Sequence, residues 1–367
     1  MTIRLFSITD YILLLIFAID LGAYFLESNL LTRYLPFLFG LNFLAFFMIK
    51  SIDFVYLALI ISIIFLCCMF RNQDSSLNIM SILINVALGF YLYLRPPNQK
   101  AIFLFSSTFL LILLMRFYNS SSDIYQIILS GSVNYISVIS ISASALYYSF
   151  VPKQNKPVNL LPAIITFILC VISTGRSGIV SSFLLLLGLI LYNYSFDKKS
   201  LIKNIAYLSF LIFAIFQIIE NFEFLYSSDQ PTSVLFRFGF DFDLDGRLLI
   251  LNEYFSNFSF ADFLFGRGNS YITQATGLSI HISYLQWHIS LGAFAIPLYA
   301  LVIFVYFKML AINKLYFLIM TVLLLRAGTD NIMLTAGFVF GSLLIYFCCV
   351  ACFPYYSRLK KQFQYIK

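Results

Sequence analysis

Charged residues are scarce in this sequence. Only 11% of the 367 residues are charged, whereas 61% are hydrophobic. A water-soluble protein of this length cannot hide that much apolar surface in its interior. The composition therefore excludes an ordinary soluble protein and indicates a polytopic membrane protein.

Histidine is also rare, and the common sequence patterns of nucleotide binding, serine hydrolysis and zinc hydrolysis are absent. The chain has two histidines, His281 and His288, and it contains no P-loop, GxSxG, HExxH or dinucleotide-binding pattern. The two histidines share a helix face about two turns apart, and no cluster of cysteines or acidic residues joins them. We therefore expect no metal, no cofactor and no nucleic acid partner.

Cysteine does not indicate a disulfide framework, because every cysteine lies inside an apolar run. The six cysteines are Cys67, Cys68, Cys170, Cys348, Cys349 and Cys352. We interpret them as small hydrophobic residues of the helix interior.

Long apolar runs dominate what is present. They are continuous rather than alternating, which is typical of membrane helices and not of a membrane barrel. About twelve segments approach spanning length: 11–26, 35–49, 54–70, 77–94, 101–117, 124–151, 160–172, 178–194, 201–219, 281–307, 315–325 and 332–353. The sequence predicts an all-α bundle of about twelve transmembrane helices that forms a single domain over residues 1–367, with the first segment retained as a span.

The distribution of charge predicts the orientation in the membrane. All twelve lysines fall in alternate connections or in the C-terminal tail, so the positive-inside rule places them, and both termini, on the cytoplasmic side. Eight arginines then fall outside: Arg33, Arg71, Arg116, Arg176, Arg237, Arg247, Arg267 and Arg326. Guanidinium binds phosphate oxygens in pairs, which ammonium does not, so we expect an anionic ligand on the outer face.

One long interval, residues 220–280, is predicted to be an extracytoplasmic loop that contains short amphipathic helices. Leu248, Leu251, Phe255 and Phe258 recur at helical spacing, and Asp245 is a candidate N-cap. The apolar stripe would let this helix lie along the bilayer surface or pack against the spans, and both alternatives remain open.

Several outer residues are candidates for the site. Arg247 would lie in the first turn of a helix, where a cation is unfavourable unless an anion shares the site. Arg176 lies in the turn STGRSG, and Arg267 lies between Gly266 and Gly268. The alternatives are an interfacial anchor for each arginine and, for Arg326, an ion pair with the nearby Asp330.

We expect different roles for the two histidines. His281, at the outer mouth of its predicted span, is placed to deprotonate an acceptor hydroxyl or to donate to a phosphate oxygen. His288 would lie deeper and is interpreted as a core polar residue with a partner.

Three stretches resemble the superfamily of O-antigen polymerases and O-antigen ligases, which are bacterial membrane glycosyltransferases. STGRSG resembles its outer-face arginine turn, and DGRLLILNEYFSNFSFADFLFGRGNSY resembles its arginine-led helix that ends in an LFGxG turn. IHISYLQWHISLGAFA resembles its histidine-led span with a downstream glycine, here Gly292. The chain departs from the family at Ile282, where asparagine is common, and it lacks the paired arginine pattern of some polymerases.

The resemblance implies polymerisation of undecaprenyl-diphosphate-linked oligosaccharides at the outer face of the bacterial inner membrane, without nucleotide sugar or ATP. It assigns Arg176, Arg247 and His281 to catalysis, and it matches Gly266 and Gly268 of the turn, which we expect to bind substrate. The gathering of arginines on the outer face adds Arg237, Arg267 and Arg326 as further candidates for substrate binding. The alternatives are an O-antigen ligase that uses a lipid A-core acceptor, and a flippase or other transporter. The partners would be the lipid-linked oligosaccharide and the bilayer, and whether a chain-length regulator protein also binds remains open.

Overall fold

The structure is a computed structural model. In the part of the chain that it describes, the regular elements are helices. The described residues are 8–22, 85–86, 88–93, 96–119, 134–151, 157–173, 176–195, 244–256, 258–267, 269–277, 283–329 and 338–352. The all-helical prediction is confirmed for these residues. They form two compact units, which are treated separately below.

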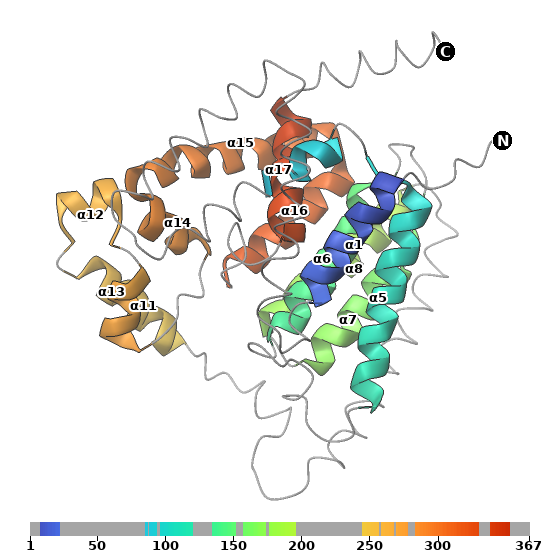
Figure 1. Ribbon diagram of the computed structural model, residues 1–367, viewed down its shortest axis with the longest axis horizontal. Coiled ribbons are helices and arrows are strands. Elements are labelled where there is room, and N and C mark those ends of the chain that lie inside the picture. The colour runs from blue at the N-terminus through green and yellow to red at the C-terminus, as the bar shows by residue number, and fades with distance from the viewer. Residues whose placement is uncertain are drawn as a thin grey trace, which may run out of the picture. The chain divides into compact units, whose positions relative to one another are not determined.

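The first unit is a bundle whose helices lie side by side (Figure 1). Its helices are α1 (Ile8–Gly22), α5 (Gln99–Asn119), α6 (Asn134–Ser149), α7 (Leu161–Ile172), α8 (Arg176–Tyr194) and residues Thr321–Arg326 of α16 (Lys314–Ala327). The central helix α6 is buried along nearly its whole described length and carries many serines. Small residues of this kind allow membrane helices to approach closely.

Polar side chains join the helices of this bundle. The Ser144 hydroxyl lies 2.6 Å from that of Thr166, and it also donates to the Pro162 carbonyl at 3.0 Å. Asn193 of α8 both donates to and accepts from the backbone of Val158, just before α7. These contacts stabilise the bundle because they give the buried side chains of Ser144, Thr166 and Asn193 hydrogen-bond partners inside it.

The second unit contains a group of short helices followed by longer ones (Figure 1). It includes α11 (Leu244–Phe255) from Arg247 onward, α12 (Phe260–Phe265), α13 (Asn269–Thr276), α14 (Ser283–Leu291), the 3₁₀ turn η3 (Gly292–Phe294), α15 (Ala295–Ile312), the rest of α16, α17 (Phe338–Cys352) and helical residues 85–86 and 88–93. Ile250, Tyr254, Ile272, Leu285 and Ile289 form the apolar core that packs α11, α13 and α14 together.

Three of the described helices are long and apolar enough to cross a membrane. They cover Gln99–Arg116, Ser177–Tyr194 and Ala295–Ile312. Two shorter apolar helices, Leu161–Ile172 and Val339–Cys352, lie within other predicted spans. The predicted segments 35–49, 54–70 and 201–219 lie outside the described residues, and the single-domain organisation stays a prediction.

The structure differs from the sequence interpretation in the segment 281–307. This run was predicted to be one span, but its described part consists of α14, η3 and α15. The break falls at Gly292, whose φ of +56° is a left-handed conformation that glycine adopts without strain. Hydropathy alone does not reveal the break, because the residues on both sides are apolar.

Helix α11 also differs in detail from its prediction. Asp245 lies inside the first turn rather than at the N-cap, because the helix begins at Leu244. Phe255 is exposed, whereas Ile250 and Tyr254 are buried, so the buried face is shifted from the predicted stripe. Helix α11 packs against α13 and α14, and its position relative to the bilayer stays a prediction.

Candidate functional site

A buried arginine joins three helices of the first unit. The Arg326 guanidinium donates through Nη1 to the hydroxyl of Ser177 and through Nη2 to the hydroxyl of Ser137, the second contact at 2.9 Å. Arg326 is only 1% exposed and is among the largest fully buried side chains described. We call Ser137, Ser177 and Arg326 the arginine–serine junction.

Local sequence explains how this junction forms. Arg326 lies in the last turn of α16, where a positive charge is favoured by the helix dipole. A methyl group on Gly178 would overlap the side chain of Ser137, so only glycine lets α8 approach α6 this closely. This close approach brings the two serine hydroxyls within reach of one guanidinium.

The junction lies beside Arg176, the predicted catalytic residue of the STGRSG turn. Arg176 is the first residue of α8, and it directly precedes Ser177. A helix N-terminus carries backbone N–H groups without helical partners, which favour an anion. The structure therefore brings the backbone of Arg176, the Arg326 guanidinium and a helix N-terminus to one end of α8; the Arg176 side chain lies outside the described part.

In the second unit, two glycines allow the C-terminal end of α12 to pack closely against the end of α14. Gly266 ends α12 with a φ of +75°, and a methyl group on it would overlap the carbonyl oxygen of Ile289. A methyl group on Gly292 would in turn overlap the carbonyl oxygen of Leu264. Both contacts require the absence of a side chain, so two glycines of the predicted motifs hold separate stretches together.

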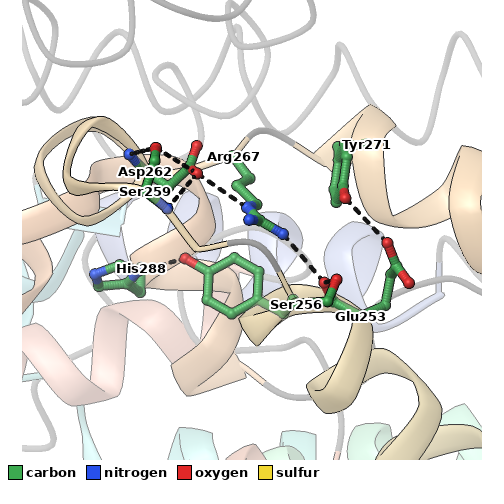
Figure 2. A network of polar contacts seen from close by, with 8 residues as sticks. Glu253, Ser256, Ser259, Asp262, Arg267, Tyr271 and His288 are labelled. Atoms are coloured by element: carbon green, nitrogen blue, oxygen red, sulfur yellow. Dashed lines mark hydrogen bonds and ion pairs between the residues drawn. The ribbon is translucent and has the colours of Figure 1, made fainter.

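Arg267, next to Gly266, is the centre of a polar network (Figure 2). Its Nε lies 3.2 Å from Oδ2 of Asp262, and its Nη1 donates to the Glu253 carbonyl at 3.1 Å. The Tyr271 hydroxyl donates to the Glu253 carboxylate at 3.0 Å. The guanidinium also lies 4.9 Å from the centre of the Tyr271 ring and 5.6 Å from that of Phe258, within cation–π range.

Asp262 has a second set of partners. It closes a capping box with Ser259, in which the Ser259 hydroxyl accepts from the Asp262 amide while the Asp262 carboxylate accepts from the Ser259 amide. Burial by itself raises the pKa of the Asp262 carboxyl, but the hydrogen bonds from Ser259 and the Arg267 guanidinium outweigh it and lower the pKa below its ordinary value. The carboxylate is therefore ionised at neutral pH.

His288 lies next to this network and is partnered by a buried tyrosine. The Tyr254 hydroxyl is hydrogen-bonded to Nδ1 of His288, which is labelled in Figure 2. The rings of Phe258 and Phe263 are each centred 6.0 Å from the imidazole. Desolvation lowers the pKa of His288, so the neutral imidazole is favoured. His288 has the polar partner that its interpretation as a core residue requires.

The structure brings together some of the predicted site residues. Gly266 and Arg267 lie in one network, and Arg326 adjoins the helix that begins at Arg176. Arg247 lies in the first turn of α11, as predicted, with its side chain outside the described part. Arg237, Gly268 and His281 lie outside the described residues altogether, as does Asp330, the predicted ion-pair partner of Arg326. The site assignments of all these residues stay predictions.

Other polar residues at these sites were not predicted. Ser137 has no sequence signal of its own, because it is one of many serines in an apolar helix. The sequence does contain a pattern that indicates the capping box, because Ser259 is followed three residues later by Asp262. No sequence pattern indicates the contacts of Tyr254 and Glu253, because their partners are distant in sequence.

Among the described residues, no three histidine, cysteine or acidic side chains lie close enough to hold a metal ion. The described cysteines, Cys170, Cys348, Cys349 and Cys352, are free thiols. No protein-family model, curated protein or solved structure matches this chain.

Proposed function

We propose that this protein is a membrane glycosyltransferase that polymerises oligosaccharide units carried on a polyprenyl diphosphate. The observation that carries the proposal is the contact between Arg326 and Ser177. It brings a buried guanidinium to the N-terminus of α8, where the chain also carries Arg176. Two arginines at a helix N-terminus suit a diphosphate, because both the guanidinium groups and the backbone N–H groups favour an anion.

The reaction follows from the chemistry of such a donor. The bond between the sugar C1 and the diphosphate oxygen breaks, and a hydroxyl oxygen of the incoming lipid-linked unit forms a new bond to C1. His281 takes the hydroxyl proton, and the polyprenyl diphosphate leaves with additional negative charge. Arg176 and Arg247 stabilise that developing charge, supported by Arg237, Arg267 and Arg326, which lowers the barrier selectively.

The protein would perform this reaction at the outer face of the bacterial inner membrane. In this proposal the chain crosses the bilayer about twelve times with both termini in the cytoplasm, and α15 takes the place of the single predicted span 281–307. Interhelical grooves would hold the polyprenyl chain, and the reaction needs no cofactor because the donor is already activated.

The positions of charge in the candidate spans favour an enzyme over a transporter. The charged residues of these three spans are Lys100, Arg116 and Lys308, and each lies near a helix end. A transporter typically places ionisable residues near the bilayer midplane.

Deletion of the gene, followed by gel analysis of the surface polysaccharide, tests the proposal. A polymerase mutant retains single units on the final acceptor and loses the ladder of longer chains. A ligase mutant instead accumulates polymer that is not joined to lipid A-core. An unchanged ladder contradicts both.

Reconstitution provides the direct assay. Purified protein in liposomes should release polyprenyl diphosphate from a lipid-linked oligosaccharide and lengthen the glycan by one unit for each carrier released. Translocation of the intact lipid-linked unit without release would identify a flippase.

A further inference from the structure

The helix α12 and the end of α11 expose a row of aromatic side chains. Phe260 is 75% exposed, Phe265 is 52% exposed, and Phe255 and Phe263 are exposed as well. Ring contacts make most of the row continuous, since Phe255 contacts Phe258, His288 contacts both Phe258 and Phe263, and Phe263 contacts Phe260. We call Phe255, Phe260, Phe263 and Phe265 the aromatic patch; exposed apolar surface of this kind marks contact with a partner or a membrane.

The aromatic patch is held at the start of a candidate span. Leu264 of α12 contacts Gly292 of η3 so closely that a methyl group on the glycine would overlap its carbonyl. Three residues after Gly292, α15 begins at Ala295 (Figure 1). The position of α12 relative to α15 is therefore determined by direct packing within the second unit.

Helix α15 has the properties of a lipid-facing span. Only 22% of its apolar window is buried, and it exposes large hydrophobic side chains along its length, including Phe304 and Phe307. Its 18 residues extend roughly 27 Å at 1.5 Å per residue, about the thickness of a hydrocarbon core. Lys308 lies near its C-terminal end, so the N-terminal end, beside α12, reaches the opposite headgroup region.

We propose that the aromatic patch is a membrane-insertion surface that enters the headgroup and upper acyl region of the same bilayer that α15 crosses. Helix α12 packs against η3, the turn that leads into the N-terminal end of α15, so the bilayer that α15 crosses is the partner that we place against the patch. The one charged residue of α12 is Asp262, which is bonded to Arg267. Insertion is thus driven by apolar burial and not by attraction of cations to anionic lipid.

The consequence is a fixed depth for the Arg267 network. Arg267 lies two residues after the end of α12, so a patch anchored in the interface holds this arginine at the level where lipid headgroups lie. This inference is independent of the proposed reaction, because it concerns only the second unit and the bilayer.

Tryptophan fluorescence in liposomes tests the proposal without any substrate. The chain has one tryptophan, Trp287, which is buried, so the unsubstituted protein supplies the background signal. Phe260→Trp and Phe265→Trp report on the patch, Phe304→Trp is the lipid-facing reference, and Gln274→Trp, at an exposed polar position of α13, is the water reference. Each variant is measured with water-soluble acrylamide and with lipids brominated near the top of the acyl chain.

The proposal predicts quenching by brominated lipid at positions 260 and 265 that is at least about half as strong as at 304, with weak acrylamide quenching. The result should be the same in phosphatidylcholine alone and with phosphatidylglycerol added. Strong acrylamide quenching without lipid quenching, as expected at 274, would overturn it. So would protection that appears only when lipid-linked oligosaccharide is added, which would identify a glycan-binding surface, or only at high protein-to-lipid ratio, which would identify contact between copies.

A sizing column shows whether a substitution has changed the fold. Phe260→Trp and Phe265→Trp keep an aromatic ring at exposed positions, so both should elute from a sizing column like the unsubstituted protein. If one does not, the other decides the outcome alone.

Discussion

The Nε of Arg267 lies 3.2 Å from Oδ2 of Asp262, while the guanidinium lies within cation–π range of the rings of both Phe258 and Tyr271. This arginine was predicted from the sequence to bind an anionic substrate, and in the structure it also holds α11, α12 and α13 together. Its Nη1 reaches the carbonyl of Glu253, the residue that accepts from Tyr271. Any contact with substrate is therefore made from a side chain whose position is already determined by protein partners.

Removal of Arg267 should destabilise the second unit. Arg267→Ala is expected to lower the free energy of unfolding by about 2–3 kcal/mol, because it removes an ion pair, a hydrogen bond and two ring contacts. Arg267→Lys should recover only part of this, since an ammonium cannot contact Asp262 and Glu253 in the same geometry. Thermal unfolding in detergent, run as a double-mutant cycle with Asp262→Asn, should give a coupling of about 1 kcal/mol; a coupling of zero contradicts the ion pair.

The stability contributed by Asp262 should depend on pH. Its pKa is lowered in the folded protein, so the carboxylate stabilises the fold above the unfolded value of about 3.9 and ceases to do so as the pH falls through the lower, folded value. The difference in melting temperature between the unsubstituted protein and Asp262→Asn should be constant from pH 7 to 5 and shrink in the acid range. A difference that grows in acid would contradict the lowered pKa.

Four glycines provide a graded test of close packing. Gly266→Ala and Gly292→Ala should each cost more than about 3 kcal/mol, because the new methyl group overlaps a carbonyl oxygen and φ is positive. Gly277→Ala, with φ of +68° but open space around it, should cost only about 1 kcal/mol. Gly22→Ala, in α1 with open space, should be neutral or slightly stabilising. Equal losses at 266 and 277 would show that backbone strain, and not packing, is responsible.

The arginine–serine junction should be essential for the first unit. Arg326→Ala is expected to cost about 3 kcal/mol or more, because it leaves a large cavity and removes the donor shared by Ser137 and Ser177. Ser137→Ala should cost about 1 kcal/mol. Arg116→Ala, at the exposed end of α5, is the matched control and should change stability by less than about 0.5 kcal/mol. Comparable effects of the two arginine substitutions would contradict a structural role for Arg326.

The proposed reaction predicts which arginines control glycan length. Arg176→Ala and Arg247→Ala should each reduce polymerisation by about 100-fold or more without loss of the membrane-inserted protein, and each lysine variant should remain impaired. Arg358→Ala, in the predicted cytoplasmic tail, is the control and should leave the ladder of glycan lengths unchanged. A normal ladder from Arg176→Ala or Arg247→Ala removes that residue from the mechanism.

Several features of the fold followed from local sequence. Nine of the twelve predicted apolar segments contain described helical residues, and the capping box of α12 is readable from Ser259 and Asp262. Such features depend on residues within a few turns of one another, which hydropathy and capping patterns sample directly. The break of segment 281–307 was missed because the left-handed conformation of Gly292 is coupled to a contact with Leu264, in another helix.

The amino acids alone determined that the chain is apolar, weakly charged and helical. The free energy of moving a side chain into hydrocarbon depends on that side chain, and each backbone hydrogen bond of a helix joins residues only four positions apart. Which polar groups meet was decided by packing over long separations: Arg326 reaches Ser177 across 149 residues, and Gly266 meets Ile289. Such pairs depend on how whole helices fit against one another. Among the described residues, Ser106 and Gly22 also lie in apolar helices but make no such contact.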